Sequence, residues 1–113
     1  MRHDQLYLAD ILQAAAAIDR FLEGITKDAF LDDELRQSAV LQKLIMIGEA
    51  AARLSPELKS RHPEIEWSDI IAFRNIAVHA YFTVDWSIVW YTAKHDVPLL
   101  AAQIGAIMDS WQD

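Results

Sequence analysis

The segment DDELRQSAVLQKLIMIGEAAARL, residues 32–54, decides the fold of this chain of 113 residues. One apolar stripe runs along it at helical spacing, and a second stripe lies beside the first. The first stripe consists of Val40, Leu44, Ile47, Ala51 and Leu54, and the second of Leu41, Ile45, Gly48 and Ala52. A helix with two apolar stripes is buried on two sides. The segment therefore predicts a central helix, and in so small a chain one of its two sides is available to a second subunit.

Helices are also predicted around this segment. From about Asp4 to Leu22, apolar residues follow each other at alternating steps of four and three, as on a helix that packs along one face. Gly24 is the predicted stop of that helix, and Asp28 is the predicted start of the next element. Ser55-Pro56 closes the central helix, because proline disfavours helical geometry in the residue before it. Residues 56–66 are then predicted to form an irregular connector.

Two further helices are predicted in the second half of the chain. Ser68 is the predicted N-cap of the third helix, and Asp85 is the predicted N-cap of the fourth. Pro98 lies inside the fourth helical pattern and is expected to kink or split it. With only three Gly and three Pro in the chain, these patterns predict an all-α fold. We expect one domain, residues 1–113, folded as an up-and-down bundle of four to five helices.

Composition narrows the classes of protein to which the chain can belong. Because the chain has no Cys, it can form neither disulfides nor thiolate metal sites. The longest apolar run, residues 39–52, is broken by Gln42, Lys43 and Glu49, so no membrane span is expected. The N-terminus lacks a secretory pattern, and the expected location is cytoplasmic. A formal net charge of −7 argues against indiscriminate binding to nucleic acid, so an RNA site needs local basic groups.

Polar side chains suited to chemistry gather in residues 74–81, RNIAVHAY. On an α-helix Asn75 and His79 share a face, whereas Arg74 and His79 are separated by roughly 140°. One straight helix therefore does not aim Arg74 and His79 at the same atom. Either the helix ends or distorts near His79, or two copies of the segment meet around one cleft of a two-fold dimer.

These side chains suit cleavage of RNA without a metal ion. The sequence has no Gly-rich phosphate loop, no Ser nucleophile elbow and no His-Glu-x-x-His helix, so neither a metal nor a cofactor is expected. A neutral imidazole at His79, with an unperturbed pKa near ~6.5, can take the proton from a ribose 2′-hydroxyl. The Arg74 guanidinium can hold the phosphate and stabilise charge that develops on it. The amide of Asn75 can orient the His79 ring.

The segment 67–82, WSDIIAFRNIAVHAYF, resembles the signature of HepT-like proteins of the HEPN superfamily. The shared motif is Arg, any four residues, His, any one residue and Tyr, and it is complete here as Arg74, His79 and Tyr81. Supporting features occur in order along nearly the whole chain. They are Ile47-Gly48-Glu49-Ala50, Trp67, Val84-Asp85, Ile88-Val89-Trp90 and Pro98-Leu99.

The resemblance implies a fold, an activity and partners. HepT-like proteins are all-α bundles that dimerise with the motif at the cleft between subunits, and they are the toxins of HepT/MntA toxin–antitoxin pairs. For this chain the resemblance implies a metal-independent endoribonuclease with RNA as its substrate and with Arg74 and His79 as the catalytic pair. The partner antitoxin, a minimal nucleotidyltransferase, is expected to silence the toxin by transferring AMP to Tyr81. An anionic nucleotide there would occupy the phosphate site and repel RNA.

Other roles are open for the same residues. The chain can instead be a non-catalytic HEPN subunit that binds a nucleotide or its partner protein, which the net charge of −7 favours. It can also be a helical dimer whose motif only stabilises the interface. In these alternatives Arg74 forms a structural salt bridge, His79 lies in the core or interface, Tyr81 is half-buried and Asn75 is a polar surface residue.

Two further groups of residues have open roles. Glu49 is costly to bury unpaired, so it is expected to pair with Arg74 or Arg53, to lie near the cleft and support the catalytic pair, or to face solvent. Trp side chains at this spacing are more typical of core or interface anchors than of surfaces on which bases stack. The four are Trp67, Trp86, Trp90 and Trp111.

Overall fold

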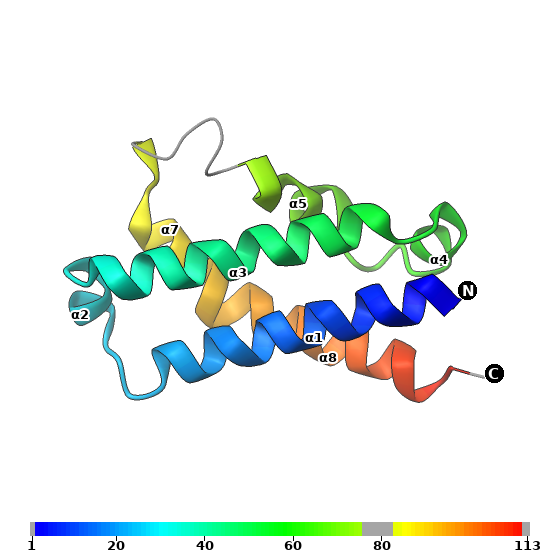
Figure 1. The fold of residues 1–113 in the computed structure, drawn as a ribbon, viewed down its shortest axis with the longest axis horizontal. Coiled ribbons are helices and arrows are strands. Elements are labelled where there is room, and N and C mark those ends of the chain that lie inside the picture. The colour runs from blue at the N-terminus through cyan, green and yellow to red at the C-terminus, as the bar shows by residue number, and fades with distance from the viewer. Residues whose placement is uncertain (1, 76–82, 112–113) are drawn as a thin grey trace.

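The computed structural model describes residues 2–75 and 83–111, and every regular element in those residues is helical, as predicted. Helices α1 (Arg2–Leu22) and α3 (Glu34–Arg53) run antiparallel and side by side, and α8 (Val97–Asp109) packs along α1 (Figure 1). The shorter elements are α2 (Lys27–Leu31), α4 (Pro56–Arg61), α5 (Trp67–Ala72), the 3₁₀ turn η1 (Phe73–Asn75), α7 (Trp86–Tyr91) and the π-helical turn η3 (Thr92–Asp96). None of the helices in this part of the chain is long and apolar enough to cross a membrane.

The core lies between α1, α3 and α8, where the predicted apolar stripes meet. All five residues of the first stripe of α3 are buried, which confirms that stripe. In the second stripe Leu41 and Gly48 are buried, whereas Ile45 and Ala52 are only half-buried. Burial on α1 centres on Leu8, Ile11, Ala14, Ile18 and Leu22, and on α8 it centres on Leu100, Ile104 and Ile107. The second side of α3 is thus less completely covered than the first.

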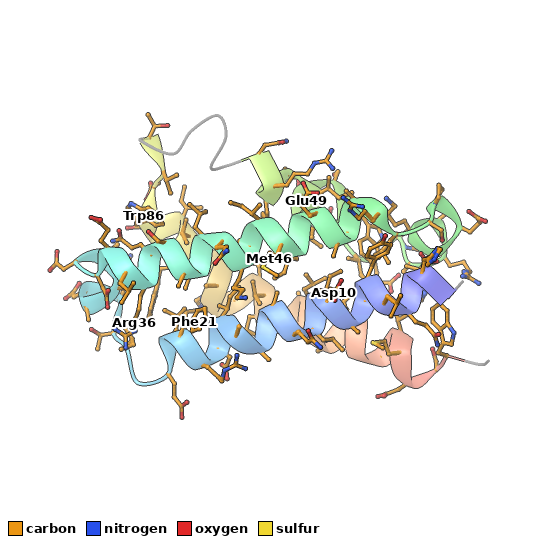
Figure 2. All side chains as sticks on the ribbon, viewed as in Figure 1. Asp10, Phe21, Arg36, Met46, Glu49 and Trp86 are labelled. Carbon is orange, nitrogen blue, oxygen red and sulfur yellow. The ribbon has the colours of Figure 1, made fainter. Side chains whose placement is uncertain are left out.

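Aromatic rings close the end of the bundle where α2 meets α7. Phe30 of α2 is fully buried, and its ring centroid lies 6.4 Å from that of Trp86 and 5.4 Å from that of Trp90. Near the same end, the Arg36 guanidinium reaches back to α1, where its Nε–H donates to the carbonyl of Phe21 at 2.9 Å (Figure 2). The tryptophans at this end therefore act as core anchors, as expected.

One prediction for the middle of the chain is wrong. Residues 56–66, predicted as an irregular connector, contain α4. Ser55 caps this helix, since its Oγ accepts a hydrogen bond from the Leu58 N–H at 3.2 Å, and Pro56 occupies the first turn. Asp4 is 2% exposed, and its carboxylate accepts hydrogen bonds from the Ser55 N–H at 2.9 Å and from the Ser55 hydroxyl at 2.6 Å. This contact ties the start of α1 to the junction of α3 and α4.

Helix starts differ from the predictions in two places and agree in a third. Helix α5 begins at Trp67 with Glu66 at the N-cap, so Ser68 lies inside the helix. Helix α2 is capped by Thr26, whose hydroxyl accepts a hydrogen bond from the Ala29 N–H at 3.2 Å, and so it begins before Asp28. Asp85 does cap α7, because its carboxylate accepts hydrogen bonds from the backbone N–H groups of residues 87 and 88.

The last helical stretch is interrupted, as the proline predicted. It passes from α7 through the π-helical turn η3 into α8, with Pro98 in the first turn of α8. Proline is tolerated in the first turn of an α-helix because the N–H that it lacks would have no acceptor within that helix. Residues 2–75 and 83–111 contain seven α-helical segments, whereas four to five helices were predicted for the chain.

Candidate active site

Gly48 brings the first part of the motif against α3. A Cβ atom on Gly48 would lie 2.8 Å from the backbone N of Arg74, 3.0 Å from the carbonyl O of Ile70 and 3.1 Å from that of Ile71. These distances are shorter than ordinary van der Waals contacts, so only glycine allows the two backbones to approach this closely. The position of Arg74 is therefore set by a direct contact between η1 and the middle of α3.

Helix α5 also holds the segment in place. Trp67, the first residue of α5, is nearly buried, and its indole N–H donates to the carbonyl of His62 at 3.0 Å. Ile70 is buried in the core, and Phe73 packs half-buried against it. Because these anchors precede Arg74 directly, the backbone that enters the motif is fixed by packing at several points.

The predicted helix through the motif ends before the motif begins. Helix α5 stops at Ala72, and the chain continues as the 3₁₀ turn through Phe73, Arg74 and Asn75. A 3₁₀ helix has about 3.0 residues per turn instead of 3.6, so ideal α-helical spacing already fails at Arg74 and Asn75. His79 lies outside the described residues. Both expected ways of bringing Arg74 and His79 together, a helix that ends or distorts near His79 and a meeting of two copies, therefore stay predictions.

Arg74 and Asn75 are both exposed to solvent. Within the part of the chain that the structure describes, the Arg74 guanidinium forms no ion pair, so the salt bridge weighed above is not formed there. The guanidinium is available to an anionic ligand. His79 and Tyr81 lie outside the described residues, and their predicted roles stay predictions.

Glu49 lies on the edge of α3 toward α5 (Figure 2). It is exposed, and among the described residues it forms an ion pair with neither Arg74 nor Arg53. In the single chain this carboxylate faces solvent, beside the close approach at Gly48, and its predicted place near a dimer cleft stays a prediction. Across residues 2–75 and 83–111 there is no group of three or more His, Asp or Glu side chains that could hold a metal ion. The chemical groups that the described part of the site offers are a guanidinium, an amide and a carboxylate.

Comparison with known proteins identifies the family. Residues 11–107 match the model of the family described as Ribonuclease HepT-like. The chain belongs to this family. It is similar to a protein of Thermococcus cleftensis named "Probable ribonuclease HepT", with 40% identity over 94 residues that cover 83% of this chain and 86% of that protein.

Two further relatives extend the HepT-like match. A protein of Caldanaerobacter subterraneus subsp. tengcongensis, named as a candidate RNase, is 31% identical over 108 residues, 96% of each chain. Another candidate RNase, from Methanocaldococcus jannaschii, is 29% identical over 103 residues, 91% of this chain and 94% of that one. No solved structure matches this chain. Because the HepT-like match begins in α1 and ends in α8, it covers the helices that build the core as well as residues 67–82.

The interpretation of the sequence missed how Gly48 acts. Gly48 was placed in the second apolar stripe of the central helix and among the HepT-like features, without a physical role. A signal was present, because a glycine in the interior of a helix costs about 0.5–1 kcal/mol relative to alanine and so marks a position with a packing reason. The sequence does not reveal the packing partner of Gly48, because that partner, the backbone at Arg74, is far away along the chain.

Proposed function

We propose that this chain is the toxin of a toxin–antitoxin pair and that it cleaves RNA without a metal ion, with Arg74 and His79 as the catalytic pair. The observation that carries the proposal is the Arg74 guanidinium, exposed and unpaired among the described residues, beside the Gly48 contact in a HepT-like chain. A guanidinium fork fits a phosphate group through two parallel hydrogen bonds. The names of the relatives, which call them ribonucleases, support RNA as the substrate.

In the proposed reaction His79 is the general base and Arg74 holds the phosphate. The neutral imidazole removes the proton of the ribose 2′-hydroxyl, the 2′ oxygen attacks the adjacent phosphorus, and the bond from phosphorus to the 5′ oxygen breaks. The 5′ oxygen takes up a proton, so the products are a 2′,3′-cyclic phosphate and a 5′-hydroxyl end. Arg74 stabilises the negative charge on the phosphoryl oxygens, and Asn75 orients the imidazole. Glu49, the residue after Gly48 on α3, is proposed to lie near the cleft and support the catalytic pair.

The active site is proposed to be composite, with residues from two copies of the chain at a dimer cleft. The half-covered second side of α3, at Ile45 and Ala52, offers apolar surface for a partner. Two copies would bring two guanidinium groups to one cleft. Together they would supply the local positive field that a chain of net charge −7 otherwise lacks.

Silencing is proposed to occur by adenylylation of Tyr81. The phenolic oxygen of Tyr81 would attack the α-phosphorus of ATP on an MntA-like nucleotidyltransferase antitoxin, forming a bond to AMP and releasing pyrophosphate. The attached AMP would place an anion near Arg74 and repel the RNA backbone. Intact mass after co-expression with such an antitoxin should rise by whole adenylyl groups, and Tyr81→Phe should abolish the rise. A rise that persists in Tyr81→Phe would place the modification elsewhere.

Cleavage by three arginine and histidine variants tests the catalytic pair. His79→Ala and Arg74→Ala should each lower RNA cleavage by about 100-fold or more, while Arg20→Ala, an exposed arginine on α1, should cleave as the wild type does. Arg74→Ala should melt near the wild-type temperature because the side chain is exposed. A folded His79→Ala protein with full activity would refute the general base. Loss of all wild-type cleavage in EDTA would refute the metal-independent reaction.

A second function is favoured by the net charge of −7, namely a non-catalytic HEPN subunit that binds a nucleotide or its partner protein. Titration calorimetry with ATP and AMP separates the two proposals, since this one requires nucleotide binding that Arg74→Ala removes. Arg74-dependent binding by a protein that cleaves no RNA would favour the binding subunit. RNA cleavage that depends on His79 would exclude it.

A further inference from the structure

An apolar groove lies between α5, η1 and the start of α8. Its volume is about 220 Å³, and its floor is formed by Ile70, Phe73, Val97 and Leu100. Leu99, in the first turn of α8, lies at the edge of the groove. Its side chain is 61% exposed, whereas that of its neighbour Leu100 is buried. Small-molecule sites usually measure roughly 300–1,000 Å³, so this groove suits one or two anchoring side chains of a larger partner better than a whole cofactor.

The rim of the groove is acidic. Its four charged lining residues are all carboxylates, namely Glu64, Glu66, Asp69 and Asp96, and all four are exposed. Glu66 and Asp96 stand at helix N-caps, yet neither carboxylate makes a capping hydrogen bond. Glu64 has one weak partner, His62, at 3.5 Å. Glu66 and Asp96 therefore do not use their carboxylates to cap helices, and Glu64 uses its carboxylate only in one weak contact.

The chemistry of the groove selects one class of occupant. RNA is disfavoured, because its phosphates would meet four carboxylates and no Lys or Arg among the lining residues. A bound metal ion does not explain the rim either, since no three of these side chains in the described residues converge on one point. Apolar contacts in the floor and separated negative charges around it complement an apolar side chain flanked by lysines or arginines.

We propose that this groove docks a basic amphipathic segment of a partner protein, with an apolar side chain of that segment against Leu99 and Phe73. Lysines or arginines on either side of the anchor would pair with Asp69 on α5 and Asp96 before α8. Each exposed ion pair of this kind contributes little to affinity. The apolar anchor therefore provides most of the affinity, and the carboxylates select a partner with positive charge. The proposal concerns a different surface from the exposed face of Arg74 and does not depend on RNA cleavage.

Fluorescence anisotropy with three labelled helical peptides tests the groove. The first peptide carries leucines on one face with lysines on both sides, the second replaces its leucines by serine, and the third replaces its lysines by glutamate. The wild-type protein should bind the first peptide about tenfold or more tighter than either of the others, since burying one leucine is worth about a factor of ten. Equal binding of the first two peptides would overturn the proposal, and so would an absence of binding to the first.

Matched variants locate the binding. Leu99→Ser should weaken the first peptide about tenfold, whereas Leu6→Ser, which removes a leucine of similar exposure (58% on α1 against 61%), should not. Asp69→Asn with Asp96→Asn should weaken it about threefold or more at low salt.

The matched charge change on α1, Asp10→Asn with Asp19→Asn, should have no such effect. Equal losses in the two charge pairs would mean only general attraction to an acidic protein and would overturn the proposal. A fall in oligomer mass in Leu99→Ser, measured by light scattering, would assign the groove to a second copy of this chain and would also overturn it.

Discussion

Replacing Gly48 by alanine tests whether the close approach of η1 to α3 holds the motif. Among the described residues Gly24 is the glycine with a positive φ, at 72°, so the requirement at Gly48 is for space and not for an unusual backbone angle. The added Cβ would stand 2.8 Å from the backbone N of Arg74, where ordinary contact begins at 3.4 Å. The crowded neighbours are backbone atoms, which cannot rotate away as a flexible side chain would.

The structure sets the sign and size of the effect. Alanine is favoured over glycine in a helix interior by about 1 kcal/mol, which opposes the clash. Overpacking of a well-filled site typically costs about 1–3 kcal/mol. We therefore expect Gly48→Ala to lower the free energy of unfolding by about 1 kcal/mol. Gly105→Ala on α8 is the matched control, because its Cβ would meet nothing within 4 Å, and it should raise the free energy of unfolding by about 1 kcal/mol.

Urea denaturation followed by circular dichroism measures both changes. The two variants should shift the midpoint in opposite directions, and the difference between them should be about 2 kcal/mol. In the RNA cleavage assay Gly48→Ala should also lose activity under conditions where it is fully folded, since the nearest displaced atom belongs to Arg74. If Gly48→Ala were as stable as Gly105→Ala and fully active, the contact would not be what positions Arg74.

Two further predictions concern the scaffold. Asp4→Ala should lower the free energy of unfolding, measured by urea denaturation, by about 1–3 kcal/mol, because it leaves the Ser55 N–H and hydroxyl without their buried acceptor. The control Asp10→Ala, on the exposed face of α1, should change it by less than about 0.5 kcal/mol. The backbone N–H of Arg36, which donates to Asp33, and the Arg36 guanidinium together hold the pKa of the Asp33 carboxyl below its ordinary value of 3.8. The ionised carboxylate therefore stabilises the folded protein fully above pH 3.8, and this stabilisation is lost as the pH falls through the lower pKa of the folded state. Asp33→Asn should accordingly be less stable than the wild type at neutral pH, and the gap should narrow in acid; a gap that does not depend on pH would refute the assignment.

The central part of the fold follows directly from the sequence. Two apolar stripes in residues 32–54 predict a central helix, and α3 lies there with its first stripe buried, although Ile45 and Ala52 of the second stripe are only half-buried. Helix α4 was missed because Ser55-Pro56 was interpreted only as the end of one helix. A serine followed by a proline also fits an N-cap and first turn, and the same two residues serve both purposes here. Asp4 could not be paired from sequence, because its partner Ser55 is far away along the chain.

For the candidate site, the sequence suggests residues but not their geometry. Arg74 and Asn75 stand out as polar residues next to an apolar helix, and Arg74 is the first residue of the HepT-like motif. Their 3₁₀ conformation was not predicted, since helical spacing alone does not distinguish an α-helix from a tighter turn over three residues. Where Arg74 lies relative to α3 depends on the contact with Gly48, which is a property of the tertiary structure.

The net charge of −7 restricts where RNA can approach this protein more than it decides whether RNA can bind. At physiological ionic strength exposed charges are screened beyond about 8 Å, so a phosphate responds mainly to the groups near it. Around the groove of α5 and α8 those groups are carboxylates without cations, and we expect RNA to avoid that surface. Arg74 follows Phe73 directly and is exposed, but it is not among the residues that line the groove, and its backbone N lies against Gly48 of α3. We therefore expect phosphate to bind at Arg74 and a basic protein to bind at the groove.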